Sequence, residues 1–239
     1  MRLTILSLLL WLGPVVHPAW AADCPSPNVP LEGYTALFNG EDLTGWKVDD
    51  KLAEHWKVID GVLDYDARAS NLWTEDSFGD FILLVEWRLK TAKELYGRET
   101  DEDGSEFAYR PDSGIYLRGT SKAQTNIWTH PMGSGEVWGY RTDQSMPEEV
   151  RTGATPSVNA DKPLGAWNQQ KIVMRGNRLT VVLNGRTVID NALLPGVPES
   201  GPIALQHHGH FNKSTGRWGP ASACVQFRNI FIKELQADE

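Results

Sequence analysis

The sequence predicts an all-β fold, a β-sandwich or jelly roll of two antiparallel sheets, on three observations. Short apolar or alternating runs recur along the chain, and turn dipeptides such as Asn39-Gly40 and Asn184-Gly185 separate them. No segment of twelve or more residues has the period of an amphipathic helix. No repeat of fixed length is present either. Many short strands with closely spaced turns are typical of a sandwich.

The expected strands follow from these runs in chain order. The clearest is residues 81–89, where five apolar side chains at alternate positions share one face and the other face includes two charged residues. On its polar face, Glu86 and Arg88 are expected to play a structural role, while Trp46 and Trp167 are expected in the core. The predicted strands are residues 33–38, 56–59, 62–63, 81–89, 112–118, 170–174, 179–183, 187–189, 202–206 and 225–235.

The N-terminus has the pattern of an export signal. Residues 1–21 combine a basic Arg2, an apolar run and an Ala-Trp-Ala cleavage site, so we expect a signal peptide. The run is too short and too interrupted by proline for a good membrane span. Residues 22–33 then predict a Pro-rich tether, and residues 34–239 the folded domain. The protein is therefore expected to be secreted or periplasmic, and a lipid anchor at Cys24 is the less favoured alternative.

Two cysteines, Cys24 and Cys224, remain after the predicted cleavage. In an oxidising compartment they can pair, and closing so long a loop stabilises by roughly 4–5 kcal/mol on the chain-entropy model. The terminal strands of sandwich folds are often neighbours, which favours the disulfide. Two unpaired thiols are the alternative.

Composition narrows the partners. The 239 residues are 41% hydrophobic and 23% charged, which is ordinary for a globular domain. The net charge is −8 without any Lys/Arg-rich run, so nucleic acid is excluded as an expected partner. Ten tryptophans suit stacking on sugar rings, although several can simply be core residues.

Two segments depart from the strand pattern, residues 93–109 and 142–164. Acidic residues at positions 101–106 could hold calcium, since hard cations prefer carboxylates, but the EF-hand pattern is absent and a solvated acidic loop is favoured. No spacing typical of a zinc site exists. No cofactor is therefore assigned beyond this open calcium alternative. Long polar loops such as 142–164 are usually functional or disordered.

Residues 112–118 are the strongest indication of a binding surface. Read as a strand, they place Asp112, Tyr116 and Arg118 on one face with Gly114 between them. An acid, a phenol and a guanidinium are unusual on a solvent-facing strand, and a bare glycine lets another group approach the backbone. This face predicts a binding floor.

Six ordered motifs then carry a family resemblance over nearly the whole expected domain. The chain resembles the domain family of unknown function 1080, now named for 3-keto-disaccharide hydrolase activity. The motifs are residues 38–46 (Phe-Asn-Gly-Glu-Asp-Leu-Thr-Gly-Trp), 112–118 (Asp-Ser-Gly-Ile-Tyr-Leu-Arg), 162–168 (Lys-Pro-Leu-Gly-Ala-Trp-Asn), 183–185 (Leu-Asn-Gly), 201–209 (Gly-Pro-Ile-Ala-Leu-Gln-His-His-Gly) and 225–230 (Val-Gln-Phe-Arg-Asn-Ile).

The resemblance implies a concanavalin A-like jelly roll and an extracytoplasmic enzyme that cleaves 3-keto-glycosides made by a separate sugar 3-dehydrogenase. Its partner is then an oligosaccharide or 3-keto-glycoside. Other members often carry a Tyr-Glu-x-Gln strand, where this chain has residues 124–128 and 135–140. The alternative function is a non-catalytic, lectin-like carbohydrate-binding module, which the same fold and polar face would serve.

Cleavage of a 3-keto-glycoside by elimination needs a base near C2, an acid near the glycosidic oxygen and donors at the C3 oxygen. His208 is the first candidate for the base, since alternation places it with Gln206 opposite the packed face of residues 203–208. A structural histidine is the alternative. His207 is expected on the packed face or the strand edge, and His210 is a weak metal candidate.

Glu136 and Lys162 are the other two catalytic candidates. Read as a strand, residues 136–140 place Glu136 beside Trp138 and Tyr140, where desolvation can raise a carboxyl pKa. Lys162, before a proline, could protonate a leaving oxygen or hold an enolate. A surface glutamate and a solvated loop lysine are the respective alternatives.

Eight further residues are predicted to bind substrate rather than to catalyse. Arg and Asp suit paired donors and acceptors toward sugar hydroxyls, although a structural salt bridge would use the same pair. The set is Asp112, Tyr116, Arg118, Gln124, Asn126, Trp138, Tyr140 and Gln206.

Overall fold

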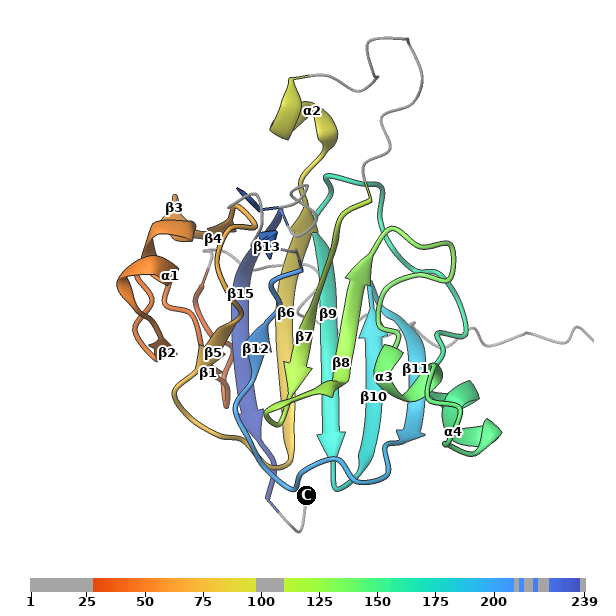
Figure 1. The fold of residues 1–239 in the computed structure, drawn as a ribbon. Helices are drawn as coiled ribbons and strands as arrows, with labels where there is room; N and C mark the ends of the chain where they lie inside the picture. The colour runs from red at the N-terminus through yellow and green to blue at the C-terminus, as the bar shows by residue number, and fades with distance from the viewer. Residues whose placement is uncertain (1–27, 98–109, 209–210, 213–216, 219–223, 237–239) are drawn as a thin grey trace, which may run out of the picture.

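Two facing antiparallel sheets form the body of the protein (Figure 1). The computed structural model describes residues 28–97, 110–208, 211–212, 217–218 and 224–236. The prediction of an all-β, jelly-roll sandwich is confirmed. Residues 1–21, Cys24, the acidic positions 101–106 and His210 lie outside the described residues, so the signal peptide, the disulfide and the calcium alternative stay predictions.

The large sheet has the last strand of the chain near its middle. Its order is β11 (Arg186–Leu193), β10 (Arg178–Leu183), β9 (Asn168–Arg175), β6 (Phe81–Leu89), β15 (Val225–Glu234), β4 (Val62–Tyr65) and β3 (Trp56–Ile59), while β1 (Thr35–Ala36) also pairs with β15. The predicted strand at 33–38 is thus shortened to the two residues of β1.

The small sheet lies in front of the large one in the view of Figure 1. Its order is β2 (Trp46–Lys47), β5 (Leu72–Thr74), β12 (Ala204–Leu205), β7 (Asp112–Leu117) and β8 (Thr120–Trp128). A separate two-stranded ribbon joins β13 (Phe211–Asn212) to β14 (Arg217–Trp218). The strand predicted at 202–206 shrinks to β12, although Gln206 N still donates to Gly114 O at 2.8 Å.

The helices of the described residues are short, from four to six residues each. None of them is long and apolar enough to cross a membrane. The expected irregular segment 142–164 contains one, and another begins within the expected strand at 136–140. They are α1 (Asp50–His55), α2 (Ala92–Tyr96), α3 (Trp138–Arg141) and α4 (Glu148–Gly153).

The core lies between the sheets, where the apolar faces of β6, β7, β8 and β15 meet. Trp46 is buried there, as predicted. The prediction for Trp167 is wrong, because this residue is only partly buried. Its ring packs against the guanidinium of Arg228, which lies 4.1 Å from the ring centroid. Arg228 is a polar residue of β15 whose side chain points away from the core. The largest fully buried apolar side chains include Trp56, Trp87, Tyr65, Tyr140, Phe38, Phe81, Phe227 and Phe231.

Several smaller expectations can be placed. Asn184 and Gly185 form a tight turn with positive φ, as predicted. His207 lies on the packed side, where its Nδ1 is 2.6 Å from the Tyr65 hydroxyl. Glu86 accepts from Arg228 and Gln169, a structural role as expected. Cys224 is buried, and burial raises the pKa of its thiol to about 11.

The first described residue is tied to the last strand. Asn28 N donates to Asn229 Oδ1 at 2.6 Å, and Asn229 N donates back to Asn28 Oδ1 at 3.0 Å. These reciprocal bonds join residues 201 positions apart in the sequence. The end of the predicted Pro-rich tether is therefore fixed to the body of the domain.

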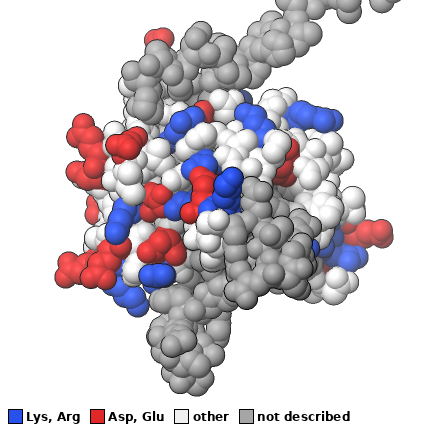
Figure 2. Space-filling view, turned by 90° about the horizontal axis from the view of Figure 1, so that it is seen from above, with Lys and Arg blue, Asp and Glu red and all other residues white. Residues whose placement is uncertain are grey.

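On the upper face, Figure 2 shows Lys and Arg interspersed with Asp and Glu among the described residues. The described part of that face carries no single basic patch. Such a surface is unlike the basic stripe of a nucleic-acid-binding domain.

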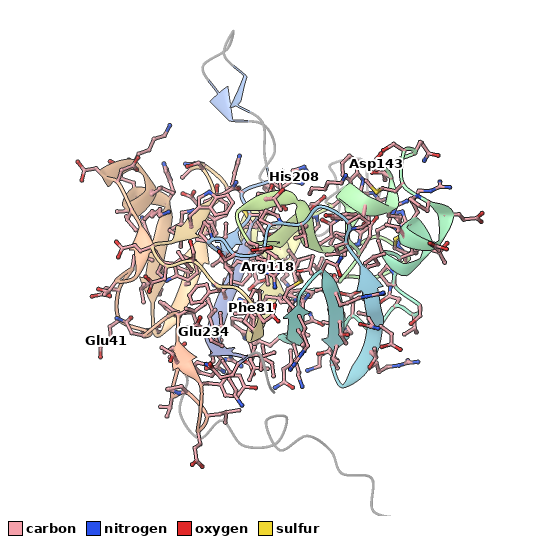
Figure 3. The ribbon with its side chains drawn as sticks, turned by 90° about the horizontal axis from the view of Figure 1, so that it is seen from below. Glu41, Phe81, Arg118, Asp143, His208 and Glu234 are labelled. Carbon is pink, nitrogen blue, oxygen red and sulfur yellow. The ribbon has the colours of Figure 1, made fainter. Side chains whose placement is uncertain are left out.

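Arg118 is a structural residue, which corrects its assignment to substrate binding. Arg118 and Gly119 both have positive φ and form the two-residue turn between β7 and β8. The left-handed backbone ends the strand alternation and turns the side chain into the protein, where only 1% of it is exposed. Figure 3 shows Arg118 near Phe81 and well away from His208.

The Arg118 guanidinium joins three connecting segments. It donates to Gly79 O at 2.8 Å, to Gly176 O at 2.6 Å, to Pro198 O at 3.0 Å and to the Asp80 carboxylate at 2.7 Å. These acceptors precede β6, connect β9 to β10, and lead from β11 toward β12. The interaction thus ties the lower ends of both sheets together.

We expect Arg118→Met to lower the free energy of unfolding by about 3 kcal/mol or more, because it leaves three carbonyls without their donor and the Asp80 carboxylate without its charged partner. Chemical denaturation measures the change. Arg178→Met, which removes an exposed arginine bonded only to Asn191 O, is the matched control and should cost less than about 0.5 kcal/mol. Equal losses in the two variants would contradict the structural role.

Candidate functional site

A cleft of about 430 Å³ opens on the face of the small sheet that points away from the core. Seven of the residues predicted from the sequence to bind or catalyse gather in it, together with Ser121 and Trp128. The predicted ones are Asp112, Tyr116, Gln124, Asn126, Trp138, Gln206 and His208.

Strand register brings these side chains together. In the β7–β8 hairpin, Asp112 pairs with Trp128, Gly114 with Asn126, and Tyr116 with Gln124. Alternate residues of both strands therefore lie on the cleft face, while the residues between them point into the core. β12 runs beside β7, so that the segment after it adds Gln206 and His208.

Gly114 makes room for a side chain across the floor of the cleft. A Cβ atom at this position would lie 2.4 Å from Gln124 Nε2. The amide of Gln124 therefore crosses directly over the backbone of β7. The sequence-based expectation that a group approaches this glycine holds, and that group belongs to the protein itself.

An amide network extends from the cleft into the interior. Gln124 Nε2 donates to Gln206 Oε1 at 2.7 Å and to Asn126 Oδ1. Asn126 Nδ2 in turn donates to Glu136 Oε2 at 2.9 Å. Each amide is oriented by the next, so the polar atoms of the floor are held in fixed positions.

Glu136 anchors this network from below instead of facing the cleft. It is fully buried, and Arg141 donates to its Oε1. Burial raises the pKa of Glu136, and the bond from Arg141 opposes that rise. The predicted strand through Glu136, Trp138 and Tyr140 is wrong, because the chain turns into α3 after Val137. Glu136 acts on the cleft through Asn126.

His208 and Asp112 form a pair at the edge of the cleft. His208 Nδ1 lies 3.1 Å from Asp112 Oδ2, and about half of the histidine side chain is exposed. The hydrogen bond that His208 donates to Asp112 raises the pKa of His208 above its usual range, and partial burial of the ring opposes this rise. The carboxylate also fixes the orientation of the imidazole. Asp112 therefore orients His208, whereas the sequence predicted that Asp112 binds sugar hydroxyls.

Tyr116 supplies a neutral hydroxyl beside the amides. Burial raises the pKa of Tyr116, while hydrogen bonding with Gln206 opposes the rise. Its ring packs against Trp73, with the centroids 5.8 Å apart. The phenol therefore stays protonated at neutral pH and is available as a donor.

Two further predicted site residues lie elsewhere. Tyr140 is in α3 and buried, and its hydroxyl donates to Pro195 O at 3.2 Å, so its assignment to substrate binding is wrong. Lys162 does not line this cleft but a second pocket beyond Trp128. Trp138, from the same helix as Tyr140, is 54% exposed and does line the cleft.

Trp128 was missed by the sequence-based assignment of site residues. It alternates with Gln124 and Asn126 along β8, and this period of two was the signal that could have identified it. Its Nε1 donates to Gly133 O at 2.8 Å, which fixes the ring at the wall of the cleft.

Within the described residues, no group of three or more His, Cys, Asp or Glu side chains is arranged to hold a metal ion. The polar groups of the cleft include an imidazole, a carboxylate, a phenol, three amides and the Ser121 hydroxyl. Such a set can transfer one proton and bind several hydroxyl or carbonyl oxygens.

Two solved structures of Parabacteroides distasonis ATCC 8503 proteins, both provisionally named glycosyl hydrolases, share the fold. The structure at 2.13 Å is 23% identical with a TM-score of 0.57, over 88% of this chain and 90% of that chain. The structure at 1.70 Å is 18% identical with a TM-score of 0.55, over 88% of this chain and 100% of that chain. At these identities the likeness establishes the fold alone.

Sequence comparison gives a narrower match. A curated 3-keto-disaccharide hydrolase of Bacteroides thetaiotaomicron is 22% identical over 193 residues, 71% of this chain. The match spans 63% of that protein's length. The family model of 3-keto-alpha-glucoside-1,2-lyase-like domains matches residues 33–233.

We expect the pKa of His208, measured by NMR titration, to lie above that of an unperturbed imidazole, because Asp112 stabilises the protonated ring. Asp112→Asn removes that charge and should lower the value. The chain contains a matched pair outside the cleft, His55 Nδ1 to Asp66 Oδ2 at 3.0 Å, so Asp66→Asn is the control and should leave His208 unchanged. A His208 pKa insensitive to Asp112→Asn would contradict the pairing.

Proposed function

The chain belongs to the family of 3-keto-alpha-glucoside-1,2-lyase-like domains, and we propose that it cleaves the glycosidic bond of 3-keto-glycosides. The observation that carries the proposal is the His208–Asp112 pair beside a neutral phenol and three oriented amides in one cleft. The export pattern of residues 1–21 supports a secreted or periplasmic location as part of the same proposal.

The chemistry starts at the acidic C2 hydrogen next to the ketone. A base removes this proton, the C1–C2 double bond forms, and the C1–O bond breaks with its electron pair going to the leaving oxygen. Water then adds at C1 and a proton returns to C2, which yields the free 3-keto-sugar. The reaction requires one base, one acid and donors toward the C3 oxygen, where enolate charge develops.

His208 is the base in this scheme. With Nδ1 bonded to Asp112, Nε2 exchanges the proton with C2 of the substrate. The adjacent Asp112 carboxylate stabilises the imidazolium that forms, as a carboxylate paired with a catalytic histidine does in other enzymes. Partial exposure of the ring allows a bound sugar to reach it.

Tyr116 and the amides provide the donors. The Tyr116 hydroxyl, kept protonated by burial, donates to the glycosidic oxygen as it leaves. The hydroxyl and carbonyl oxygens of the keto sugar are oriented by Gln206, Gln124 and Asn126. The hydrogen bonds among these amides fix which atom of each amide faces the substrate. Trp138, exposed at the rim, offers a ring for the apolar face of the sugar.

Purified protein should release 3-keto-glucose from 3-keto-trehalose or a 3-keto-glucoside, as followed by chromatography. His208→Ala is expected to lower kcat/KM by at least about a hundredfold, because a positioned base contributes that much. His55→Ala, which removes the other Asp-paired histidine, should retain activity. Equal activity of the two variants would exclude His208 as the base. Tight binding of unoxidised glycans by calorimetry without any turnover would instead support a carbohydrate-binding module.

The pH dependence follows from the same pair. A base must be unprotonated, so kcat/KM should fall as the pH drops through the pKa of His208. Because Asp112 raises that pKa, the acid limb of the profile lies above pH 6.5, the value for an unperturbed imidazole. Asp112→Asn should move the limb to lower pH and also reduce the maximal rate. A limb that stays in place would show that another group titrates.

A further inference from the structure

The cleft continues past Trp128 into two more cavities. The next one, of about 420 Å³, shares Asp112 and Trp128 with the cleft. The farthest, of about 460 Å³, shares Trp128, Thr129, His130 and Pro131 with the one before it. Trp128 lines all three. The three cavities therefore form one groove, whose far end we call the distal pocket.

The distal pocket lies between the sheets' upper edge and the segment before β9. Apolar groups form much of its wall, among them Trp87, Leu89 and Leu164, and the last is 43% exposed. Lys162 and Asp161 add an ammonium and a carboxyl group. An apolar wall with a few polar groups is the usual form of a small-molecule site, and the aromatic groups among them suit the apolar face of a sugar ring.

The Asp161 carboxyl group of the distal pocket is held in place. Asp161 Oδ2 accepts from Ser134 N at 2.8 Å, and Asp161 N donates to Asn159 Oδ1 at 2.9 Å. Oδ1 of Asp161 is buried and has no hydrogen-bond partner in the protein. Burial also raises the pKa of this carboxyl. A buried oxygen without a partner costs stability unless another group satisfies it, such as a ligand hydroxyl.

An aromatic pair joins the cleft to the distal pocket. Trp128 and His130 stack with their centroids 4.7 Å apart and an interplanar angle of 25°. Trp128 is fixed by its bond to Gly133 O, and His130 Nδ1 accepts from Met132 N at 3.2 Å. The turn that carries His130 packs closely on Asn159, since a Cβ at Gly133 would lie 2.8 Å from Asn159 Cα. The pair is thus a rigid platform between the two sites.

We propose that this groove binds the leaving group of the substrate, and that the leaving group is an oligosaccharide of two or more sugar units. The inference rests on the proposed function, because it places the keto sugar in the cleft. Asp112 lines both the cleft and the middle cavity, so the scissile bond lies where these two meet, beside His208. The first leaving unit then contacts Trp128 and His130, and the second enters the distal pocket.

The substrate class is accordingly a 3-keto-oligosaccharide oxidised at its non-reducing end. An enzyme with only the cleft would accept a small leaving group equally well. Here the interactions at Lys162 and Leu164 become available only to a leaving group long enough to reach them. Longer substrates should gain binding energy that shorter ones lack.

The test compares kcat/KM for three substrates that share the 3-keto-glucosyl unit. Their leaving groups are p-nitrophenol, glucose and a glucose disaccharide. We expect the wild type to prefer the glucose-disaccharide leaving group over glucose by about tenfold or more, since both leave as sugar hydroxyls of similar acidity and differ in length. Lys162→Met and Leu164→Ala should each remove most of that preference and leave the p-nitrophenyl substrate unaffected. Ile59→Ala, at another exposed aliphatic residue, is the control for Leu164→Ala and should leave the preference intact.

The outcomes separate the two proposals. The groove proposal is overturned if all three substrates are cleaved and kcat/KM does not depend on the length of the leaving sugar. It is also overturned if Lys162→Met lowers kcat/KM by the same factor for every substrate. In both cases the proposed function still stands. If no substrate is cleaved, the proposed function fails. Calorimetry with unoxidised gluco-oligosaccharides of two to four units then decides the groove: affinity that rises with length and falls in Lys162→Met supports it, and affinity independent of length overturns it.

Discussion

The buried guanidinium of Arg118 is the interaction on which the arrangement of the sheets depends. It reaches the segments before β6, between β9 and β10, and after β11 from the turn of the β7–β8 hairpin. Because both sheets end at this point, one side chain fixes the position of the β7–β8 hairpin over the large sheet. The floor of the cleft is that hairpin, so the geometry of the site depends on a residue that no substrate touches.

In the proposed reaction, proton transfer and the orientation of the substrate belong to different residues of the cleft, although the sequence pattern did not distinguish them. Two residues that line the cleft, His208 and Tyr116, carry the groups that can exchange or donate a proton in the proposed reaction. The amides behind them only orient, and Glu136 holds those amides from a fully buried position. A carboxylate buried below the floor can orient polar groups without contacting the sugar, and solvent does not screen its electrostatic effect. This orienting role explains why Glu136 is buried beneath the cleft although the proposed reaction does not use it as an acid or a base.

The sequence predicted the sandwich and most of the cleft because both follow from a local period of two. Asp112, Gly114 and Tyr116 share a face wherever β7 pairs, and the same holds for Gln124 and Asn126. The errors occur where that period stops. Positive φ at Arg118 reverses its side chain, and α3 replaces the alternation expected at residues 136–140. Lys162 lies in a loop, whose position depends on tertiary contacts that no periodicity encodes. His208 was identified because the alternation of side chains continues past the end of β12, so that Gln206 and His208 both face the cleft.

The place of β15 in the large sheet has a consequence for how that sheet closes. The strand lies between β6 and β4, and it also carries β1 and the bonds to Asn28. Without β15, the facing edges of β6 and β4 would be unpaired, and β1 and Asn28 would lose their partner. Strands far apart in the sequence therefore meet only when β15 is in place, so the closure of the large sheet depends on contacts of high sequence separation and is expected to be a late, slow step of folding.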